Sequence, residues 1–481
     1  MMSLLTIILV TLHALLGIAA IVWILLGEGD SGWKVAWTAL FILIPEITIV
    51  VYVLLGLRYR RGGMYKRLHA PVAELFEREL HLDSSVMEPD FSTVADEYKP
   101  LARLFCTCSS SNIVTSGNNF EIITSGERKR ELLLADLRSA KKYIHIEYFR
   151  FGADKTGHEV REILEQKAAE GVEVRVLFPN ISNRWQKWSF FQHMIDRGVE
   201  VNKFTNSKLN WRVIIMRINC QDHRKIVVVD GKVAYTGGMN LNDNYFYRWR
   251  DTHLRIEGPS VNILEAAFVD NLLTSGGTLS HHLTYYFTSR FEPSPAPFEG
   301  KSLQVVTDAA EYPFTSAQMG YEWVLTNAKK YVYLQTPYFM PPEPVLDALK
   351  SAALRGVDVR IMLPEKVDTP LMGLGNQSYY EECAAAGIKI YIRGGNFIHS
   401  KTMVADDYIS VVGASNLDTR SFQLNSEVNT FIYDREAAIC CRDIFLKDNN
   451  STLLDVDKWK ASRSIWNRLG SALMRVLSFS L

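Results

Sequence analysis

The chain has no excess of charge of either sign. Its 481 residues include 53 Lys and Arg and 53 Asp and Glu, so the formal net charge is zero. Proteins dedicated to nucleic-acid binding usually carry a basic excess, and this chain has none. Disordered chains are poor in apolar residues, whereas 47% of this chain is hydrophobic and 22% is charged. The composition therefore predicts folded domains and argues against a nucleic-acid partner.

Several common signatures are also missing. The six cysteines contain no Cys-x-x-Cys pair and no zinc-binding spacing, and we interpret them as buried free thiols in a reducing compartment. The sequence has no Gly-x-Ser-x-Gly elbow, no phosphate-binding P-loop and no His-Glu-x-x-His motif. These absences argue against three widespread classes of protein: serine hydrolases of the elbow type, P-loop nucleotide-binding proteins and zinc proteases.

Two long apolar runs stand at the N-terminus. Residues 4–26 contain no Asp, Glu, Lys or Arg, and a helix of this length measures about 35 Å, more than the roughly 30 Å core of a bilayer. A second run, residues 35–57, follows a short polar turn. A signal peptide is the alternative for the first run, but a basic n-region is missing and a second run follows directly. We therefore predict a transmembrane hairpin over residues 1–61.

Basic residues follow the second apolar run at once: Arg58, Arg60, Arg61, Lys66 and Arg67. Basic flanks stay on the cytoplasmic side of a membrane, so we expect the rest of the chain in the cytoplasm. Glu46 is a carboxyl inside the second run and thus a functional candidate. The alternative, which we prefer, is a protonated residue inside the hairpin beside Pro45.

The remainder of the chain is duplicated. Residues 140–149 resemble 328–339, and residues 171–179 resemble 356–364. The second pair begins with glycine after a helical pattern and has the composition of a buried strand. Alternating helices and strands at this long period predict two similar α/β sandwich halves. We place a linker with a short helix, the first half and the second half at residues 62–110, 111–290 and 291–450.

A matched histidine motif occurs once in each half. One copy runs from His223 through Lys225 to Asp230, and its sequence has the form His-x-Lys-x-x-x-x-Asp. A single motif of this kind is usually no more than the surface of a strand. Two copies at equivalent places in a duplicated chain are not explained in that way. The second copy contains His399, Lys401 and Asp406.

Further polar residues keep the same spacing in both halves. Asn240 and Asn416 lie ten residues after the motif aspartates, and Asp251 and Glu427 lie 28 residues after the motif histidines. Gly237 and Gly413 also correspond; glycines there would let backbone N–H groups approach an anion. We predict that all these positions belong to one site.

Alternation along a strand puts the histidine and lysine of each motif on one face. If the halves pack about a pseudo-twofold axis, one cavity holds two imidazoles and two ammonium groups. Lys225 and Lys401, with the amides of Asn240 and Asn416, suit a phosphate group and its additional charge in a transition state. Because lysine supplies the positive charge, the chemistry requires neither a metal nor a cofactor.

Two imidazoles allow a covalent route. One attacks phosphorus and becomes a phosphohistidine, while the other protonates the leaving oxygen and then deprotonates the incoming hydroxyl. Asp251 and Glu427 are the candidate partners for the second nitrogen of each imidazole. Asp230 and Asp406 end their strands, and we interpret them as structural orienters in preference to proton carriers.

These motifs resemble those of the phospholipase D superfamily and, within it, the bacterial cardiolipin synthases. The resemblance rests on residues 217–231 and 247–258 in the first half, and on 335–341 and 413–422 in the second. The N-terminal hairpin fits the same family, so the resemblance covers nearly the whole chain. It implies two phospholipase D-like α/β halves with one shared active site.

The resemblance also implies the reaction. One phosphatidylglycerol gives its phosphatidyl group to an enzyme histidine and releases glycerol, and a second phosphatidylglycerol then accepts the group to form cardiolipin. No nucleotide is needed. The catalytic positions fall on His223, Lys225, Asp230, His399, Lys401 and Asp406, with phosphate contacts from Asn240 and Asn416. By analogy, His223 is the expected nucleophile and His399 the acid and base. The expected location is a bacterial inner membrane, with the enzyme multi-pass and a homo-oligomer compatible with the sequence.

The C-terminal segment, residues 451–481, is predicted to be a basic amphipathic helix. It has five basic residues and no acidic residue from position 458 onward. Such a helix suits an anionic lipid surface; the alternatives are a helix packed on the catalytic domain or a dimer contact.

Three rival functions remain open: a hydrolase that uses water as acceptor, a nuclease with the same motifs, and an inactive membrane scaffold. The apolar hairpin argues against a soluble nuclease, and intact motifs argue against a scaffold. Transfer and hydrolysis differ only in acceptor access.

Overall fold

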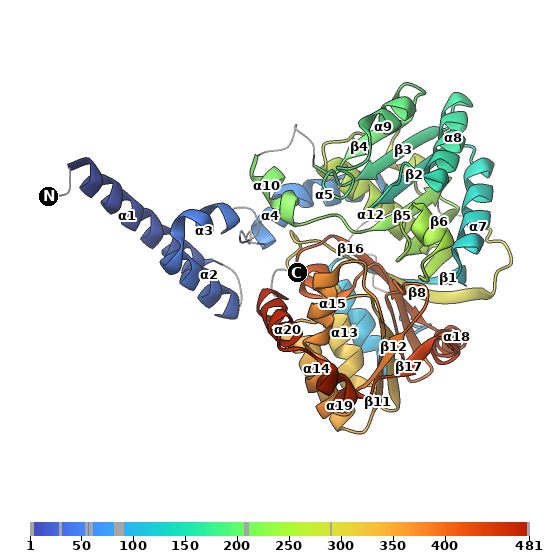
Figure 1. Ribbon diagram of the computed structural model, residues 1–481. Helices are drawn as coiled ribbons and strands as arrows, with labels where there is room; N and C mark the ends of the chain where they lie inside the picture. The colour runs from blue at the N-terminus through green and yellow to red at the C-terminus, as the bar shows by residue number, and fades with distance from the viewer. Residues whose placement is uncertain are drawn as a thin grey trace.

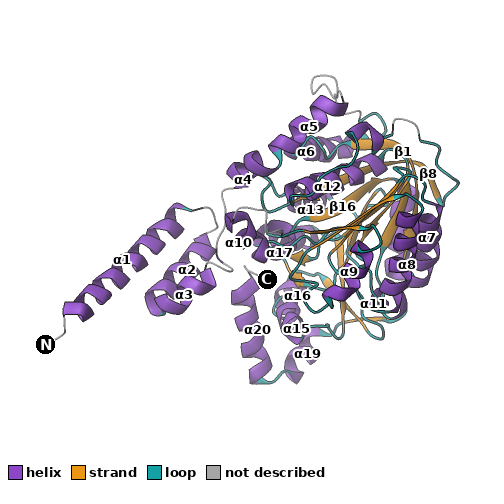
Figure 2. Ribbon diagram, turned by 90° about the horizontal axis from the view of Figure 1, so that it is seen from above, coloured by secondary structure: helices purple, strands orange, loops and turns teal. Residues whose placement is uncertain are grey.

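The main body of the protein is built on one mixed sheet of 15 strands. The computed structural model describes residues 4–27, 31–52, 56, 61–80, 91–205, 211–288 and 291–478. Within them, three N-terminal helices project from one side of the body, and the C-terminal helix lies on that same side (Figure 1). Helices cover both faces of the sheet (Figure 2).

Seven strands of the sheet come from the first half of the chain: β1 (Val114–Ile123), β2 (Tyr143–Tyr148), β3 (Glu173–Phe178), β4 (Glu200–Lys203), β5 (Lys225–Val229), β6 (Val233–Gly237) and β7 (His253–Glu257). Eight come from the second half: β8 (Phe298–Asp308), β9 (Tyr331–Gln335), β11 (Asp358–Pro364), β12 (Lys389–Arg393), β13 (Thr402–Ala405), β14 (Ile409–Gly413), β16 (Glu427–Tyr433) and β17 (Ser451–Leu453). A separate parallel pair is formed by β10 (Phe339–Met340) and β15 (Leu417–Asp418).

The strand order reflects the duplication. From one edge it is β17-β12-β11-β9-β13-β14-β16-β8-β1-β7-β6-β5-β2-β3-β4. Apart from β17, the order outward from the central β8–β1 pair is the same in both halves. β1 and β8 pair antiparallel, with Val114 opposite Gln304. The expected two sandwiches are therefore joined edge to edge, which satisfies the backbone groups that two free central edges would leave unpaired.

The first half carries helices α7 (Gly126–Ser139), α8 (Lys155–Ala169), α9 (Trp188–Ile195), α10 (Trp211–Asn219), α11 (Asp243–Tyr247) and α12 (Ser260–Thr274), and a short 3₁₀ turn, η3 (Leu283–Tyr285). The second half carries α13 (Ser316–Asn327), α14 (Glu343–Leu354), α15 (Pro370–Gln377), α16 (Tyr380–Ala385), α17 (Thr419–Gln423) and α18 (Arg435–Leu446). As predicted, α8 and α14 each lead into a glycine and then a buried strand.

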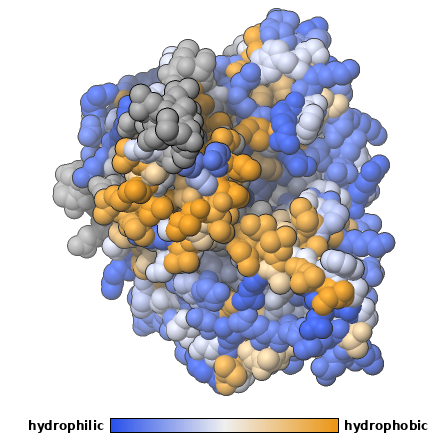
Figure 3. All heavy atoms as spheres, turned by 60° about the vertical axis from the view of Figure 1, so that its left-hand side comes forward, coloured by the Kyte–Doolittle hydropathy of each residue, from blue (hydrophilic) through white to orange (hydrophobic). Residues whose placement is uncertain are grey.

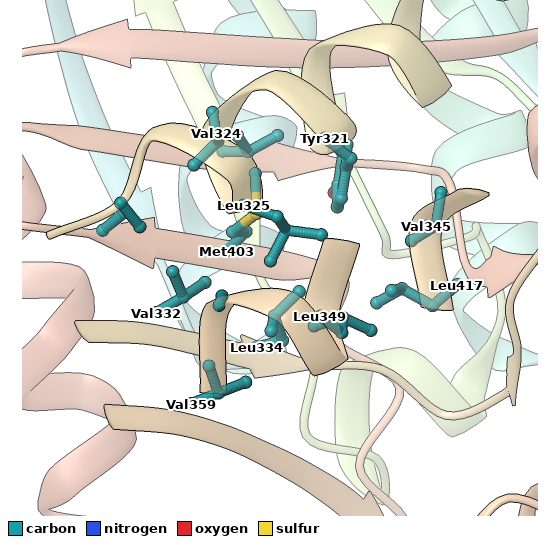
Figure 4. Close-up of a cluster of buried hydrophobic side chains, with 14 of the residues drawn as sticks. Tyr321, Val324, Leu325, Val332, Leu334, Val345, Leu349, Val359, Met403 and Leu417 are labelled. Atoms are coloured by element: carbon teal, nitrogen blue, oxygen red, sulfur yellow. The ribbon is translucent and has the colours of Figure 1, made fainter. Parts of the chain in front are cut away.

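Each half has its own apolar core, and a third core is shared. Figure 4 shows the core of the second half, where Leu325 of α13 and Leu349 of α14 cover Leu334 of β9. The shared core contains Val228 of β5 and Val428 of β16, both fully buried. Burial of such side chains contributes roughly 1.5–3 kcal/mol each, so the shared core holds the two halves in a fixed relation.

The N-terminal region differs from the predicted hairpin. The first run forms α1 (Leu4–Leu26) as one helix, but the second is divided into α2 (Ser31–Leu43) and α3 (Pro45–Val51). Proline lacks an N–H donor and disfavours helical backbone in the preceding residue, and Ile44 accordingly has φ −144° and ψ 64°. Within the described parts of the chain, no helix combines the length and the hydropathy needed to cross a bilayer. The end of the second run, with Arg58 and Arg60, lies outside the described residues.

The linker contains more helix than predicted. In place of one short helix it has α4 (Arg61–Leu68), α5 (Ala70–Leu80) and α6 (Lys99–Cys108), with a 3₁₀ turn, η2 (Asp96–Tyr98), before α6. Leu75 and Phe76 of α5 pack against the first half, and Phe105 of α6 is buried in the core of the second half. Residues 81–90 of this linker lie outside the described residues.

The C-terminal segment forms two helices where one was predicted. α19 (Val456–Ser462) ends before the extended backbone of Arg463, and α20 (Ile465–Leu477) begins after Ser464. The hydroxyl of Ser464 accepts a hydrogen bond from the backbone N–H of Asn467, which caps the new helix. Residues 479–481 lie outside the described part.

Candidate active site

The two motif histidines stand just before equivalent strands. His223 precedes β5 and His399 precedes β13, and each donates its backbone N–H across to the other half. The acceptor of His223 is the carbonyl of Ser426 at 2.8 Å, and that of His399 is the carbonyl of Arg250, also at 2.8 Å. These reciprocal bonds place both histidines at the junction of the halves.

The side chains of the histidines are held by carboxylates of the opposite half. Nδ1 of His223 lies 2.9 Å from Oε1 of Glu427, and Nδ1 of His399 lies 2.7 Å from Oδ2 of Asp251. Each carboxylate follows the other histidine along the chain, so the partners are crossed between the repeats. With an ionised carboxylate, the proton of each ring is on Nδ1 and the lone pair is on Nε2. Both rings are thereby prepared to act through Nε2.

The motif lysines lie against the histidines. Nζ of Lys225 donates to the backbone carbonyl of His223 at 2.5 Å, and Nζ of Lys401 lies 3.1 Å from Nε2 of His399. Lys225 is fully buried and Lys401 is 1% exposed. Two buried lysines, one in each half and each in contact with its motif histidine, suit the binding of an anion.

The two predicted phosphate-contact asparagines have different surroundings. The amide of Asn240 is satisfied on both sides: Oδ1 accepts from the backbone N–H of Arg150 at 3.1 Å, and Nδ2 donates to the hydroxyl of Tyr245 at 2.8 Å. Oδ1 of Asn416 is buried and has no hydrogen-bond partner among the described residues. A buried amide oxygen without a donor is costly, so Asn416 is the asparagine that a hydrogen-bonding ligand would satisfy.

The motif aspartates lie away from the histidines. Asp230 and Asp406 lie seven residues after the histidines. They follow the far ends of β5 and β13, strands of five and four residues that are about 17 and about 13 Å long. The carboxylate of Asp230 accepts hydrogen bonds from the backbone N–H groups of Lys141, Lys142 and Tyr143. Asp406 accepts the three equivalent bonds in the second half. These bonds give both aspartates a structural task, which agrees with their interpretation as orienters, and a direct part in catalysis stays a prediction.

The matched glycines also have a structural explanation. A Cβ atom at Gly237 would lie 2.7 Å from Cα of His253, and one at Gly413 would lie 2.9 Å from Cα of Asn429. Real Cβ atoms do not approach other atoms so closely. The close approach of the neighbouring strand, and not an anion, accounts for glycine at these positions.

Sequence reasoning missed the groups behind the motifs. The middle residue of the first motif, Arg224, is 2% exposed, and its Nε lies 3.0 Å from Glu147 and 3.1 Å from Asp222. The middle residue of the second, Ser400, instead lies 3.0 Å from the hydroxyl of Thr252 and also contacts Arg250. The sequence shows that the middle residues differ, arginine in one motif and serine in the other. It does not show which residues they contact.

Aromatic rings around the histidines were also missed. The ring of Phe149 lies 4.7 Å from that of His223. His399 has four such neighbours, at ring distances between 5.1 and 6.4 Å: Tyr245, Trp249, Phe397 and Tyr338. Among the described residues, His399 thus has more aromatic neighbours than His223, although both histidines are buried.

Burial dominates the electrostatics of the site. It lowers the pKa of Lys225 to about 7 and that of Lys401 to about 8. Burial, and then the nearby lysines, also hold the pKa values of His223 and His399 well below the usual range. Without a bound anion, burial therefore favours neutral imidazoles, which can attack or accept a proton, and the negative charge of a bound phosphodiester favours protonation of one of them.

The carboxylates show the opposite shift. Burial raises the pKa of Asp251 to about 6 and that of Glu427 to about 7, although the lysines oppose the rise. The site thus brings two lysines and two carboxylates together away from solvent, and an incoming phosphodiester would pair with the lysines. In the described parts of the chain, no group of three or more His, Cys, Asp or Glu side chains is placed to hold a metal ion.

Comparison with known proteins agrees with this geometry. The family described as "Cardiolipin synthase, PLD-like domain" matches residues 133–271 and 323–449, more than half of the chain. The chain belongs to the cardiolipin synthase family. The matched segments contain both histidine motifs and both carboxylates, Asp251 and Glu427.

Relatives of this family match over nearly the full length. The chain is 34% identical to the major cardiolipin synthase ClsA of Bacillus subtilis (strain 168), over 95% of this chain and 96% of that protein. It is 33% identical to a cardiolipin synthase of Listeria monocytogenes serotype 4a (strain HCC23), over 99% of both. Among solved structures, phosphatidylserine synthase of Haemophilus influenzae Rd KW20 has a TM-score of 0.58 at 15% identity, covering 80% of this chain and 100% of that one. This likeness concerns the fold alone.

Proposed function

We propose that this protein is a cardiolipin synthase that transfers a phosphatidyl group from one phosphatidylglycerol to another, giving cardiolipin and glycerol. The observation that carries the proposal is the pair of imidazoles, His223 and His399, each held through Nδ1 by a carboxylate of the opposite half. Membership of the cardiolipin synthase family supports the same substrates. One active site is built from both halves.

In the first step, Nε2 of His223 attacks the phosphorus of the donor. A phosphorus–nitrogen bond forms, the bond from phosphorus to the glycerol oxygen breaks, and a protonated His399 gives its proton to that oxygen. His399 is chosen as the acid because the positive charge of Lys401, whose Nζ lies 3.1 Å from Nε2 of His399, favours release of a proton from that nitrogen. Glycerol leaves neutral.

In the second step, the neutral His399 accepts the proton of the acceptor's hydroxyl. The resulting oxygen attacks phosphorus, the phosphorus–nitrogen bond breaks, and His223 returns to its starting state. One phosphodiester has replaced another, so no nucleotide is consumed. Lys225 and Lys401 can donate to the phosphoryl oxygens, and Oδ1 of Asn416 can accept from the incoming hydroxyl. Asn240 holds the turn that contains Arg150 in place.

Product analysis tests the reaction. Purified protein is given labelled phosphatidylglycerol in mixed micelles, and the lipid products are separated. We expect cardiolipin and glycerol in equal amounts. Phosphatidic acid as the only product would assign the protein to hydrolysis and overturn the proposal.

Trapping of the intermediate tests the division of roles. We expect His399→Ala to accumulate a labelled protein adduct, because the nucleophile remains and the base for the second step is lost. His223→Ala should give no adduct. The reverse pattern would transfer the role of nucleophile to His399.

Membrane association is the second part of the proposal. Apolar side chains of α20 stand in solvent at helical spacing, and five of them are more than half exposed: Ile465, Trp466, Leu469, Leu473 and Val476. Trp211 of α10 is 62% exposed as well. Figure 3 faces the side from which the N-terminal helices project and shows apolar residues gathered across it. Such a surface suits the interface of a bilayer.

We infer that α1–α3 and α20 hold the enzyme on the cytoplasmic face of a bacterial inner membrane, with residues 1–61 as the hairpin anchor. Arg463, Arg468 and Arg475 line a pocket between α20 and the body, where Arg475 pairs with Glu382 at 2.8 Å. Basic residues near such a surface suit anionic headgroups. Leu469→Glu with Leu473→Glu should reduce binding to vesicles of phosphatidylglycerol, measured by flotation. A matched change on the opposite side of the body, Arg138→Glu, should leave it unchanged, and equal binding of both variants would refute a role for α20.

A further inference from the structure

Two turns lie beside the motif histidines, one with Arg150 after β2 and one with Tyr338 after β9, and we call them the entrance to the site. The first turn carries an arginine where the second carries none. Arg150 follows β2, and its backbone N–H donates to Asn240. The turn around it is fixed by Asn183, whose Oδ1 accepts from the N–H of Phe151 at 3.0 Å and whose Nδ2 donates to the carbonyl of Phe149 at 2.8 Å. The backbone of Arg150 is thus held on both sides.

The second half repeats this turn with a different side chain. Asn376 accepts from the N–H of Phe339 at 2.7 Å and donates to the carbonyl of Pro337 at 2.9 Å. The residue between these two anchors is Tyr338. Because the two asparagine clamps are equivalent, Tyr338 occupies in the second half the place that Arg150 occupies in the first.

Arg150 lies next to the reacting groups yet has no anionic partner. Its guanidinium stands 6.0 Å from the centre of the Phe149 ring, and that ring lies 4.7 Å from His223. The side chain is exposed, and no carboxylate of the described residues pairs with it. Its positive charge is among the influences that lower the pKa of both motif histidines, His223 and His399. The positive charge of Arg150 therefore acts on the histidines of both halves.

The opposite side of the entrance has the reverse character. The hydroxyl of Tyr338 donates to Oδ1 of Asp368 at 2.6 Å, and the ring lies 6.4 Å from that of His399. Asp368 is exposed. An anion entering the site is thus attracted toward Arg150 and repelled from Asp368.

The proposed reaction needs a place for a second anion. The donor phosphate is engaged by Lys225 and Lys401, yet the acceptor phosphatidylglycerol carries its own phosphate, three carbon atoms from the attacking hydroxyl. A second phosphate beside the first is repelled unless another cation is present. A guanidinium binds phosphate in a bidentate manner and also fixes its orientation.

We propose that Arg150 binds the phosphate of the acceptor phosphatidylglycerol and thereby selects an anionic lipid over water as the acceptor. This assignment rests on the proposed function. It makes one side of the entrance cationic, at Arg150, and the other anionic, at Asp368. The acceptor phosphate lies on the side of Arg150, and its terminal hydroxyl points to the phosphohistidine. Tyr338 and Asp368 keep a phosphate off the other side.

A neutral acceptor separates this role from catalysis. Labelled glycerol can enter phosphatidylglycerol by exchange through the same phosphohistidine, and glycerol carries no phosphate. In Arg150→Gln we expect cardiolipin formation to fall at least about tenfold, with a higher KM for phosphatidylglycerol as acceptor and a larger share of phosphatidic acid. Glycerol exchange should fall far less. Arg150→Lys should recover part of the cardiolipin formation.

The control is Arg138→Gln, an exposed arginine at the end of α7, close to the strand ends that Asp230 holds. It should change neither reaction. If Arg150→Gln lowers glycerol exchange as much as cardiolipin formation, or leaves the ratio of cardiolipin to phosphatidic acid unchanged, the assignment of Arg150 is wrong. Phosphatidic acid alone from the unaltered enzyme would instead overturn the proposed function itself.

Discussion

The two halves of the site have the same ionisable side chains at the reacting centre and differ in the residues around it. Each half supplies a histidine, a buried lysine and a buried carboxylate at the same spacing. Behind the first motif is a buried ion cluster around Arg224, whereas behind the second is the hydroxyl of Ser400. At the entrance, arginine in one half corresponds to tyrosine in the other.

This difference indicates a division of labour between chemically equivalent histidines. Two identical halves would give two identical imidazoles, but an attacking base and a proton donor need different surroundings. Among the described residues, His223 has one aromatic neighbour, whereas His399 has four. The two halves thus share the groups proposed to bind phosphate and differ in the side chains around the histidines.

The crossed carboxylates provide the strongest way to break this symmetry. Asp251→Asn and Glu427→Gln should each lower kcat by about 10³–10⁴-fold, because the amide favours the wrong tautomer of its histidine. Glu427→Gln should slow formation of the labelled adduct, as expected for a partner of His223. Asp251→Asn should slow its breakdown, as expected for a partner of His399. Rapid-quench measurement of the adduct shows which step each variant slows. If Glu427→Gln slowed breakdown and Asp251→Asn slowed formation, the crossed pairing would be contradicted.

The next largest effect concerns the residues between histidine and lysine in each motif. Arg224→Met removes the cation of a buried cluster and leaves Glu147 and Asp222 without compensation, so the free energy of unfolding should fall by about 3–5 kcal/mol. Ser400→Ala removes one hydroxyl and should cost about 1 kcal/mol. Denaturation in detergent, followed by near-ultraviolet circular dichroism, measures both. Equal losses would show that the two motifs are supported alike.

The motif aspartates should behave alike in both halves. Asp230→Asn and Asp406→Asn weaken three backbone hydrogen bonds each, and we expect a loss of about 1–3 kcal/mol of stability in either variant. Asparagine tolerates the positive φ of 55° and 52° found at these positions. Turnover per folded molecule should fall far less than in Asp251→Asn. A loss of turnover without a loss of stability in either variant would make that aspartate a participant in the reaction.

The smallest effect is that of pH. As pH rises through 6 and 7, Asp251 and Glu427 lose their protons and kcat/KM should rise. Above about 7 and 8, Lys225 and Lys401 lose theirs and it should fall, so a maximum is expected near pH 7. A bound anion favours protonated lysine, so the alkaline limb of kcat should lie at higher pH than that of kcat/KM. Coincident alkaline limbs would exclude the lysines as phosphate ligands.

Much of the site could be predicted from spacing because the repeat supplies an internal comparison. The motif residues and the strands that follow Gly171 and Gly356, β3 and β11, were all predicted. Contacts between residues far apart in the sequence could not be predicted, because the alternation of side chains along a strand describes only the two faces of that strand. The division of the second apolar run at Pro45 was within reach, because proline restricts the residue before it.

The sequence by itself determined the chemistry: which side chains occur, in matched pairs, and that they suit a phosphodiester. Only the tertiary structure decided which carboxylate serves which histidine, because the partners are 204 and 148 residues apart and two equivalent acids compete for each imidazole. It also decided that the halves share one sheet, and that Arg150 and Tyr338 stand at equivalent places. The physical reason is that reactivity depends on residue type, whereas pairing depends on how the two halves are packed.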